Sequence, residues 1–470
     1  MLHIEPNWFA YCALGVWPVV ALYLYVRLPV AQATLWTILA AHLLLPVRAE
    51  IKFDMVPAFD KSSIPNLAAL LGCALFARKR PKIFHGFGIA EGLIVVLVCT
   101  PFVTSMLNTD PIPIGDIVLP GVGYYDALSA AVAQFIFIIP FFLGRQFLRD
   151  SADIGRILWA MVIAGLVYSL PMLFEIKMSP QLHTWVYGYF PHQFAQQVRD
   201  GGFRPVVFIG NGLLVAFFAM TTAVASAALW RARIRVTRLP AYATTAYLSA
   251  VLVLCKTLGA LIYGVVLIPL VRWASLRLQL RIATLLVMVA LAYPLLRVAD
   301  VVPTQDILGW ANTVSAERAE SLKTRFDQEK LLLTHAWDRK WFGWGRFGRS
   351  RVYFDNGEDR SITDGEWINT MGTFGLVGFA AEFGLLAFAV LRAAATFKSA
   401  PTTQDAIYAT ALTLIIAVNI FDLIPNSTIF PWTWLLVGAL LGRAESLRET
   451  TRQWKRAEVE SLPGFGLTKA

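Results

Sequence analysis

The chain has few charged residues. Only 15% of its 470 residues are Asp, Glu, Lys or Arg, whereas a soluble domain has about 25%. Hydrophobic residues make up 57% and the mean hydropathy is +0.58. The apolar residues come in long runs almost free of charge, which is typical of a chain whose solvent is lipid. The composition therefore indicates a polytopic integral membrane protein. It excludes a soluble enzyme, a secreted disulfide scaffold and a disordered chain.

Cysteine is scarce as well. The four cysteines, Cys12, Cys73, Cys99 and Cys255, lie in or beside apolar runs and show no CxxC spacing. We interpret them as small hydrophobic residues rather than redox or metal-binding groups. Residues 1–7 contain no Lys or Arg before the first apolar run, so we expect no cleavable signal peptide. We also find no soluble domain, low-complexity tract or internal repeat.

Thirteen apolar segments approach the length needed to cross a bilayer, which is about 20 residues for a helix. They predict an all-α fold, a polytopic membrane helix bundle of about 12–13 transmembrane helices. The segments are residues 8–26, 30–47, 64–77, 88–107, 125–144, 157–174, 205–230, 240–254, 258–271, 282–297, 367–391, 406–424 and 430–442.

The positions of Lys and Arg predict which loops are cytoplasmic, since short cytoplasmic loops are rich in both. Residues 108–124 and 425–429 contain neither, while the alternate loops and the C-terminus are basic. The net charge of +10 is explained in this way, and no nucleic-acid partner is expected. Thirteen spans would place the N-terminus outside, and twelve would place it inside. Residues 1–297 are predicted to hold ten transmembrane helices with short loops, of which those at 78–82, 145–156, 231–238 and 272–281 are basic. Residues 298–366 are predicted to form a large periplasmic loop. Three further transmembrane helices at 367–442 and a basic cytoplasmic tail at 443–470 follow.

The loop of residues 298–366 is unusually long, and loops of this length are usually functional. Within it, apolar residues recur at helical spacing from 316 to 338, which predicts an amphipathic helix. Residues 342–349 (FGWGRFGR) form a glycine-punctuated turn, so the helix should end before them.

Cationic residues crowd the predicted outer side. Arg204 precedes one span, Lys256 lies in a tight connector, and ten Lys or Arg residues lie between 298 and 366. Arginine forks match phosphate geometry, so these positions suit an anionic ligand at the outer leaflet. A plainer interpretation also stands: long loops escape the positive-inside rule, and their charges serve only to solvate the surface. The loop residues singled out as substrate-binding candidates are Arg325, Arg349 and Arg351.

The segment Thr363–Glu366 (TDGE) places two carboxylates directly before an apolar span. Asp364 could accept a proton from a sugar hydroxyl. Alternatively, the two carboxylates stabilise a helix N-terminus. Residues 355–359 lack calcium-loop spacing and His335 shows no ligand spacing, so we expect no metal.

Several motifs resemble those of the bacterial O-antigen polymerase and O-antigen ligase-like family. They are residues 343–345 with 361–364, then WINTMGTFGLVGF at 367–379, FRPVVFIGNGLLVAF at 203–217, and CKTLGAL at 255–261. Together they cover about the second half of the chain. The resemblance implies a polytopic glycosyltransferase that uses glycans carried on undecaprenyl pyrophosphate, without a cofactor or metal.

Carried over to this sequence, the resemblance implies that Arg204 and Lys256 contact the pyrophosphate and that Arg325 belongs to the outer helix. Two positions depart from the family pattern. Asp364 and Gly365 stand where ligases carry a His-Asn pair, and Leu258 stands where an arginine is expected. The first departure counts against a ligase that uses histidine and leaves a polymerase open, with Asp364 as the base.

The resulting hypothesis is a polysaccharide polymerase of the bacterial inner membrane with a periplasmic active site. It would join undecaprenyl-pyrophosphate-linked repeat units into O-antigen, capsule or exopolysaccharide, with a chain-length regulator as a possible partner. Trp341, Trp344 and Tyr353 would stack on sugar rings, and burial against the membrane spans explains these aromatic residues equally well. The alternatives are a ligase that passes glycan to another acceptor, and a transporter or flippase of lipid-linked or anionic solutes. Intramembrane charges, which transporters use, are few: Glu382 and Glu91.

Overall fold

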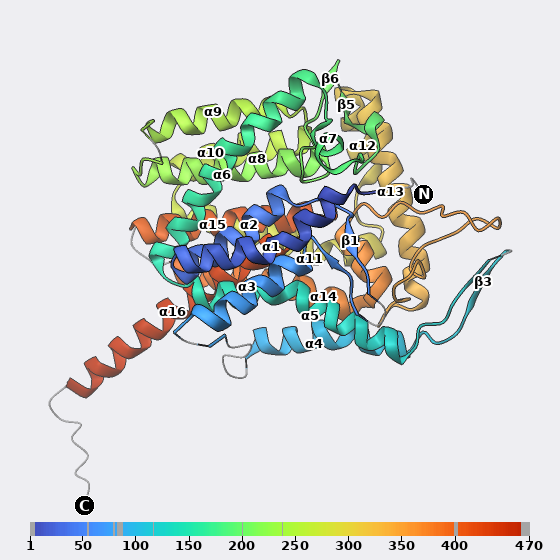
Figure 1. Ribbon diagram of the computed structural model, residues 1–470, viewed down its shortest axis with the longest axis horizontal. Coiled ribbons are helices and arrows are strands. Elements are labelled where there is room, and N and C mark those ends of the chain that lie inside the picture. Colours follow the sequence, from blue (N-terminus) through green and yellow to red (C-terminus); the bar gives the residue numbers. More distant parts are fainter. Residues whose placement is uncertain are drawn as a thin grey trace, which may run out of the picture.

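The structure of the protein is a computed structural model that describes residues 5–53, 56–78, 80–81, 88–115, 117–199, 201–236, 238–398 and 403–461. These residues form sixteen α-helices, one short 3-10 helix and three two-stranded antiparallel sheets. Most of the helices run side by side in one bundle (Figure 1). The predicted all-α helix bundle is therefore confirmed.

All thirteen predicted apolar segments are helical. By length and composition, eight helices are able to cross a membrane, and α2, α3, α9 and α10 are apolar but shorter. The protein is thus a multi-pass membrane protein. The thirteen helices are α1 (Trp8–Arg27), α2 (Val30–Leu44), α3 (Ser63–Phe76), α4 (Ile89–Met106), α5 (Tyr124–Phe147), α6 (Ser151–Met178), α8 (Gly212–Arg231), α9 (Ala241–Leu254), α10 (Leu258–Trp273), α11 (Leu276–Val298), α14 (Glu366–Phe397), α15 (Gln404–Asp422) and α16 (Pro431–Ser461).

The remaining elements gather at one end of the bundle, on the right in Figure 1, which we call the loop-rich end. The described residues of the connections between α5 and α6, between α8 and α9 and between α10 and α11 lie at the other end of the bundle (Figure 1). The elements of the loop-rich end are β1 (Glu50–Ile51), β2 (Phe59–Asp60), β3 (Ile112–Ile114), β4 (Ile117–Leu119), α7 (Leu182–Tyr187), the 3-10 helix Phe194–Gln197, β5 (Val198–Arg199), β6 (Gly202–Phe203), α12 (Thr304–Val314) and α13 (Ala316–Asp338).

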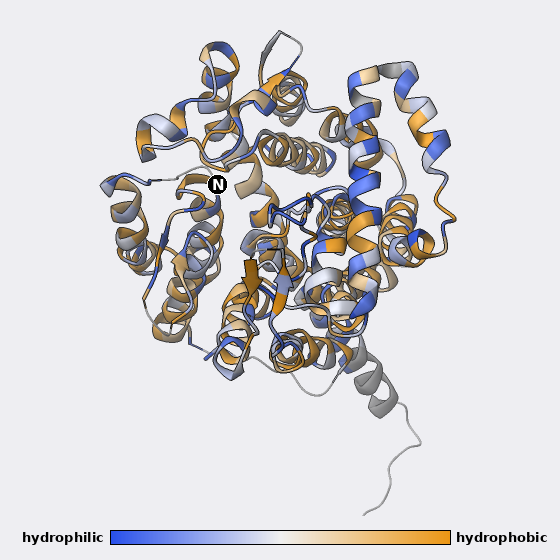
Figure 2. Ribbon diagram, turned by 90° about the vertical axis from the view of Figure 1, so that its right-hand side faces the viewer, coloured by the Kyte–Doolittle hydropathy of each residue, from blue (hydrophilic) through white to orange (hydrophobic). Residues whose placement is uncertain are grey.

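The amphipathic helix predicted over 316–338 is present as α13 with the same bounds. Polar and apolar residues alternate along it where it crosses the loop-rich end (Figure 2). The short helix α12 before it was not predicted. The residues of the predicted tail begin as a continuation of α16, which runs unbroken to Ser461. Residues 462–470 of that tail, and Lys79 and Lys82 of the first basic loop, lie outside the described residues.

The predicted span over 205–230 begins later than expected. Its helix, α8, starts at Gly212, and Asn211 caps it by accepting a hydrogen bond from the Leu213 N–H. The preceding turn is stable because the Glu175 carboxylate accepts the N–H groups of Val206 and Val207, each at 2.7 Å. Arg204 therefore lies in a connection at the loop-rich end rather than at the start of the membrane helix.

The predicted span over 367–391 is present as α14, which breaks at Gly375 (φ 71°, ψ −169°). The glycine-rich turn packs into this break: the Leu376 N–H donates to the Lys340 carbonyl at 2.7 Å, and the Trp344 N–H donates to the Gly372 carbonyl at 2.9 Å. A Cβ on Gly375 would lie 2.3 Å from the Trp341 carbonyl oxygen. Only glycine fits there, and an uninterrupted membrane helix begins after the break.

The buried Glu91 belongs to an ion-pair network away from the loop-rich end. Arg145 pairs with Glu91 at 2.9 Å and with Glu445 at 2.7 Å, which joins α4, α5 and α16. Because both partners neutralise the buried guanidinium, this intramembrane charge holds helices together.

Candidate functional site

The candidate catalytic residue, Asp364, forms an ion pair with Arg325 at the loop-rich end. Arg325 Nε lies 3.2 Å from Asp364 Oδ2, and the Asp364 side chain is 43% exposed. Arg325 also donates from Nη1 to the Pro425 carbonyl at 3.3 Å. The N-cap of α14 is Gly365, and no side chain caps it. Asp364 is therefore not the helix cap, and its accessible carboxylate is held in place by α13.

Two cavities adjoin this ion pair. The first cavity has a volume of about 670 Å³ and the second about 620 Å³, both within the range of ligand sites. The Arg325–Asp364 pair lines both of them. The residues that line both are His192, Asn211, Leu213, Arg325 and Asp364.

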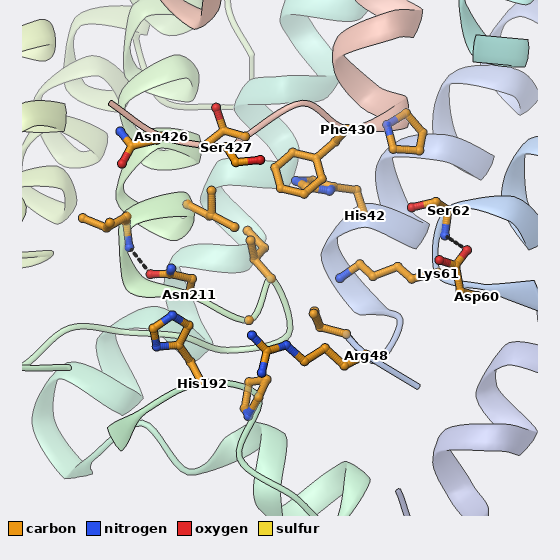
Figure 3. A pocket seen from close by; sticks show the side chains of 18 of the residues that line it. His42, Arg48, Asp60, Lys61, Ser62, His192, Asn211, Asn426, Ser427 and Phe430 are labelled. Atoms are coloured by element: carbon orange, nitrogen blue, oxygen red, sulfur yellow. Dashed lines mark hydrogen bonds between the residues drawn. The ribbon is translucent and has the colours of Figure 1, made fainter. Parts of the chain in front are cut away.

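The first cavity is lined by two cations from the connection between α2 and α3. Figure 3 shows Arg48 and Lys61 pointing into it opposite His192. Lys61 Nζ donates to the Phe208 carbonyl at 2.8 Å. Burial lowers the pKa of Lys61 to about 7, and burial likewise lowers the pKa of His192. An ammonium surrounded by protein gains from a bound anion, which replaces the lost hydration.

The second cavity has both polar and apolar walls. Arg204 and Gln197 line it on one side, and side chains of α11, α12 and α13 such as Val289 and Leu322 line the other. Arg204 Nε donates to the Lys256 carbonyl at 3.3 Å. This cavity therefore combines a guanidinium with a surface suited to a hydrocarbon chain.

Lys256 is not among the residues that line either cavity. Its Nζ donates to the Arg199 carbonyl at 3.2 Å. Its backbone takes a left-handed conformation with φ 51°. Lys256 is therefore bonded to the connection that carries Arg204, through the Arg199 carbonyl.

Arg349 and Arg351 also line neither cavity; Arg351 Nη2 lies 3.5 Å from the hydroxyl of Thr363, which lines the first. The Arg349 side chain is fully buried and donates to the carbonyls of Asp110, Pro120 and Trp344 at 2.8, 3.0 and 3.2 Å. Arg351 pairs with Asp359 at 2.5 Å. Both arginines hold the outer loop together in this structure, and the connection between α4 and α5 is part of that assembly.

The aromatic candidates are likewise part of the loop. The His335 ring stacks on Trp344 with centroids 4.3 Å apart, and Trp344 Nε1 donates to the His335 carbonyl at 2.7 Å. Trp341, Trp344 and Tyr353 do not line either cavity. Trp341 is 61% exposed and faces outward.

Glu366 lies behind the ion pair and is buried, with its carboxylate accepting a hydrogen bond from Ser427. It lines a smaller cavity of about 280 Å³ together with Glu382, which accepts a hydrogen bond from Thr370 at 2.6 Å. Within the described part of the chain, no group of three or more His, Cys, Asp or Glu residues is arranged to hold a metal ion.

Arg48 and Lys61 were missed at the level of sequence. A signal was present, since their connection lies on the predicted outer side, where short loops normally carry few cations. Asn211, which lines both cavities, was visible only as part of a motif.

Comparison with protein-family models and with curated proteins gives no match for this chain. The fold and the site define its class instead. It is a multi-pass helical membrane protein in which two cation-lined cavities meet at an Arg–Asp ion pair.

Proposed function

We propose that the protein is a polysaccharide polymerase of the bacterial inner membrane, which joins undecaprenyl-pyrophosphate-linked repeat units at the periplasmic face. The observation that carries this proposal is the exposed carboxylate of Asp364 at the junction of two cavities. A polymerase must bring two lipid-linked glycans together, one as donor and one as acceptor. Two adjoining cavities with one carboxylate between them suit that task.

In the proposed reaction, Asp364 accepts the proton of an acceptor sugar hydroxyl. The hydroxyl oxygen attacks the anomeric carbon of the donor sugar, and the bond from that carbon to the pyrophosphate oxygen breaks. The electron pair leaves with the lipid pyrophosphate. Cations fixed at the cavity walls, Arg204 and Arg325 among them, stabilise the charge that develops on the leaving group. Arg325 also fixes the orientation of the Asp364 carboxylate through their ion pair.

The motif resemblance supports the same class of enzyme. The glycine turn at 343–345 lies in the outer loop, and the segment at 372–376 lies in α14. Their backbones pack against one another. This contact fixes the start of α14, and the carboxylate of Asp364 directly precedes that helix. The glycines of both motifs thus serve to position the candidate base.

The proposal is tested with purified protein in detergent and lipid-linked repeat units from a strain that makes them. We expect the wild type to lengthen the glycan without a sealed compartment. Asp364→Asn should reduce polymer formation about 10²–10⁴-fold, because general-base catalysis contributes that much. Asp327→Asn, which changes an exposed carboxylate on the same side, is the matched control and should polymerise normally. Normal polymer from Asp364→Asn would remove this residue from the reaction.

One observation favours a second function, transport of an anionic or lipid-linked solute. Glu366 and Glu382 share a small cavity beside the break in α14, and transporters place charges at broken helices. Uptake of a solute into sealed vesicles by wild-type protein, lost in Glu382→Gln and unaccompanied by glycan lengthening in detergent, would favour transport over polymerisation.

A further inference from the structure

Two cations of the first cavity are available to a ligand. Arg48 forms no hydrogen bond or ion pair with any residue in the described ranges, and its backbone takes a left-handed conformation with φ 64°. Lys61 Nζ uses one of its three N–H groups on the Phe208 carbonyl. Both side chains point into the cavity in Figure 3. A left-handed backbone is unfavourable for arginine, so this conformation brings the guanidinium to the cavity at a cost.

Three helices also begin at the wall of this cavity. Ser62 is the N-cap of α3, Asn211 is the N-cap of α8, and Pro431 is the first residue of α16. All three line the first cavity. The N-terminus of a helix carries partial positive charge and free N–H groups, which favour a phosphate. At α3 and α8 the first N–H groups are already bonded to side chains, of Asp60 for α3 and of Gln197 and Asn211 for α8, so these helix ends add partial positive charge beside the two side-chain cations.

A buried hydroxyl gives an independent sign of a ligand. Thr428 lines the first cavity and is 4% exposed, and its Oγ1 has no hydrogen-bond partner among the described residues. A buried polar group without a partner costs about 1–3 kcal/mol. Rotation of the Thr428 side chain toward the cavity would let a ligand oxygen satisfy it.

The acidic residues of the cavity are already engaged. Asp60 Oδ1 accepts the N–H groups of Ser62 and Ser63 at 2.9 and 2.7 Å. Glu50 pairs with Lys52 at 2.7 Å, and Asp364 pairs with Arg325. Glu50 and Asp364 are thus paired with other cations and Asp60 is held by N–H groups, so Arg48 and Lys61 remain to pair with an incoming anion.

We propose that the first cavity binds the diphosphate headgroup of a lipid-linked glycan through Arg48 and Lys61, as a site separate from Arg204 in the second cavity. This inference rests on the proposed function, because it assigns one lipid diphosphate to each cavity. With both sites filled, the two glycans approach Asp364 from opposite sides. The site recognises a diphosphate, and its place at the end of membrane helices suits a lipid-borne one.

Binding is measured with purified protein in detergent and three probes: undecaprenyl pyrophosphate, undecaprenol and inorganic pyrophosphate. The wild type should bind two molecules of undecaprenyl pyrophosphate per chain. The double variant Arg48→Gln/Lys61→Gln should bind one, with affinity at the lost site reduced at least about 10–100-fold, since charge-assisted hydrogen bonds are removed. Arg204→Gln should retain the first site and weaken the second. Lys52→Gln, an exposed cation in the same connection, is the matched control and should bind two.

Unchanged binding in the double variant, or one site in the wild type that only Arg204→Gln removes, would overturn the proposed site. Equal affinity for inorganic pyrophosphate and for undecaprenyl pyrophosphate would overturn the proposal that the bound diphosphate is carried on a lipid. The cavity would then be a site for the free anion. Lys61→Arg, which keeps a positive charge in the cavity, is measured beside the double variant as a check on folding and should keep the site occupied. The proposed function is judged separately, by glycan lengthening. Two binding sites without lengthening in the wild type would end the polymerase proposal alone, and lengthening with only one site would end this inference alone.

Discussion

Charged side chains at the loop-rich end divide into those that face the cavities and those that hold the loops. Arg48, Lys61 and Arg325 face the first cavity. Arg349 donates its N–H groups to backbone carbonyls, and its side chain is fully buried. The two groups cannot be told apart by residue type, because a guanidinium serves equally well for a ligand phosphate and for loop carbonyls.

The lowered pKa of Lys61, at about 7, predicts a pH dependence of diphosphate binding. Below this pH the side chain is an ammonium and attracts the anion. Above it the amine becomes neutral, so affinity at the first cavity should fall as pH rises from 6.5 to 8.5. Lys61→Arg should remove this fall, because guanidinium stays charged throughout the range. The measurement is titration of undecaprenyl pyrophosphate at several pH values.

Other ionisable groups face Lys61 in the same cavity, and the ligand itself titrates. Comparison with Lys61→Arg cancels the contribution of the ligand and of the shared neighbours. An identical slope in both proteins would show that Lys61 does not control the dependence. The groups that face the cavity are His42, Arg48, Glu50, Asp60, His192, Arg325 and Asp364.

At the level of the elements, one carboxylate fixes α13 over the second cavity. Glu329 accepts hydrogen bonds from Tyr293 at 3.0 Å, from Arg297 at 3.2 Å and from Trp367 at 3.3 Å. These three residues come from α11 and α14. Arg297, a cation at the end of a predicted span, is therefore a partner of α13, and Glu329 positions the helix that carries Arg325.

Glu329→Ala should destabilise the packing of α13, because it leaves the buried Arg297 without its partner. Removal of one member of a buried ion pair costs about 3–5 kcal/mol. We expect a lower unfolding temperature and faster proteolysis within residues 316–338. The exposed Lys330→Ala on the same helix should change neither. Equal protection of both variants would show that apolar packing alone holds α13.

The break in α14 is a second feature of one element. Gly375→Ala requires a residue with a Cβ at φ 71° and a contact of 2.3 Å with the Trp341 carbonyl oxygen. The left-handed conformation alone costs about 1–2 kcal/mol, and the close contact adds to it. The variant should show reduced membrane abundance and polymer. Gly309→Ala in α12, where a Cβ meets nothing within 4 Å, should be tolerated. Normal abundance of Gly375→Ala would show that the loop can move away.

For the whole molecule, the segregation of the loops predicts the orientation in the membrane. In a variant whose four native cysteines are replaced by alanine, a cysteine at Asn356 should react with a membrane-impermeant maleimide in intact cells. A cysteine at Arg233 should react only after the membrane is opened. Both residues lie in exposed turns, at opposite ends of the bundle. Labelling of Arg233→Cys in intact cells would place the cavities on the cytoplasmic side and end the polymerase proposal.

The sequence by itself determined that the apolar segments are helical, and it determined both ends of α13. These features are local, because apolar runs must form helices in lipid and periodicity is read over one turn after another. The sequence also indicated Asp364 and Arg325 as candidate site residues, because both lie in or beside the motifs in the second half of the chain.

Only the tertiary structure decided which cations face a common cavity. Lys61 meets Phe208 across 147 positions of the chain, Arg325 meets Pro425 across 100, and Arg349 meets Asp110 across 239. No local pattern encodes such contacts. They arise because the helices pack in one arrangement, in which close backbone approach at glycines such as Gly375 decides how far each loop can enter. The separation of Arg48 and Lys61, which face the cavity, from Arg349 and Arg351, which hold the loop, follows from that packing.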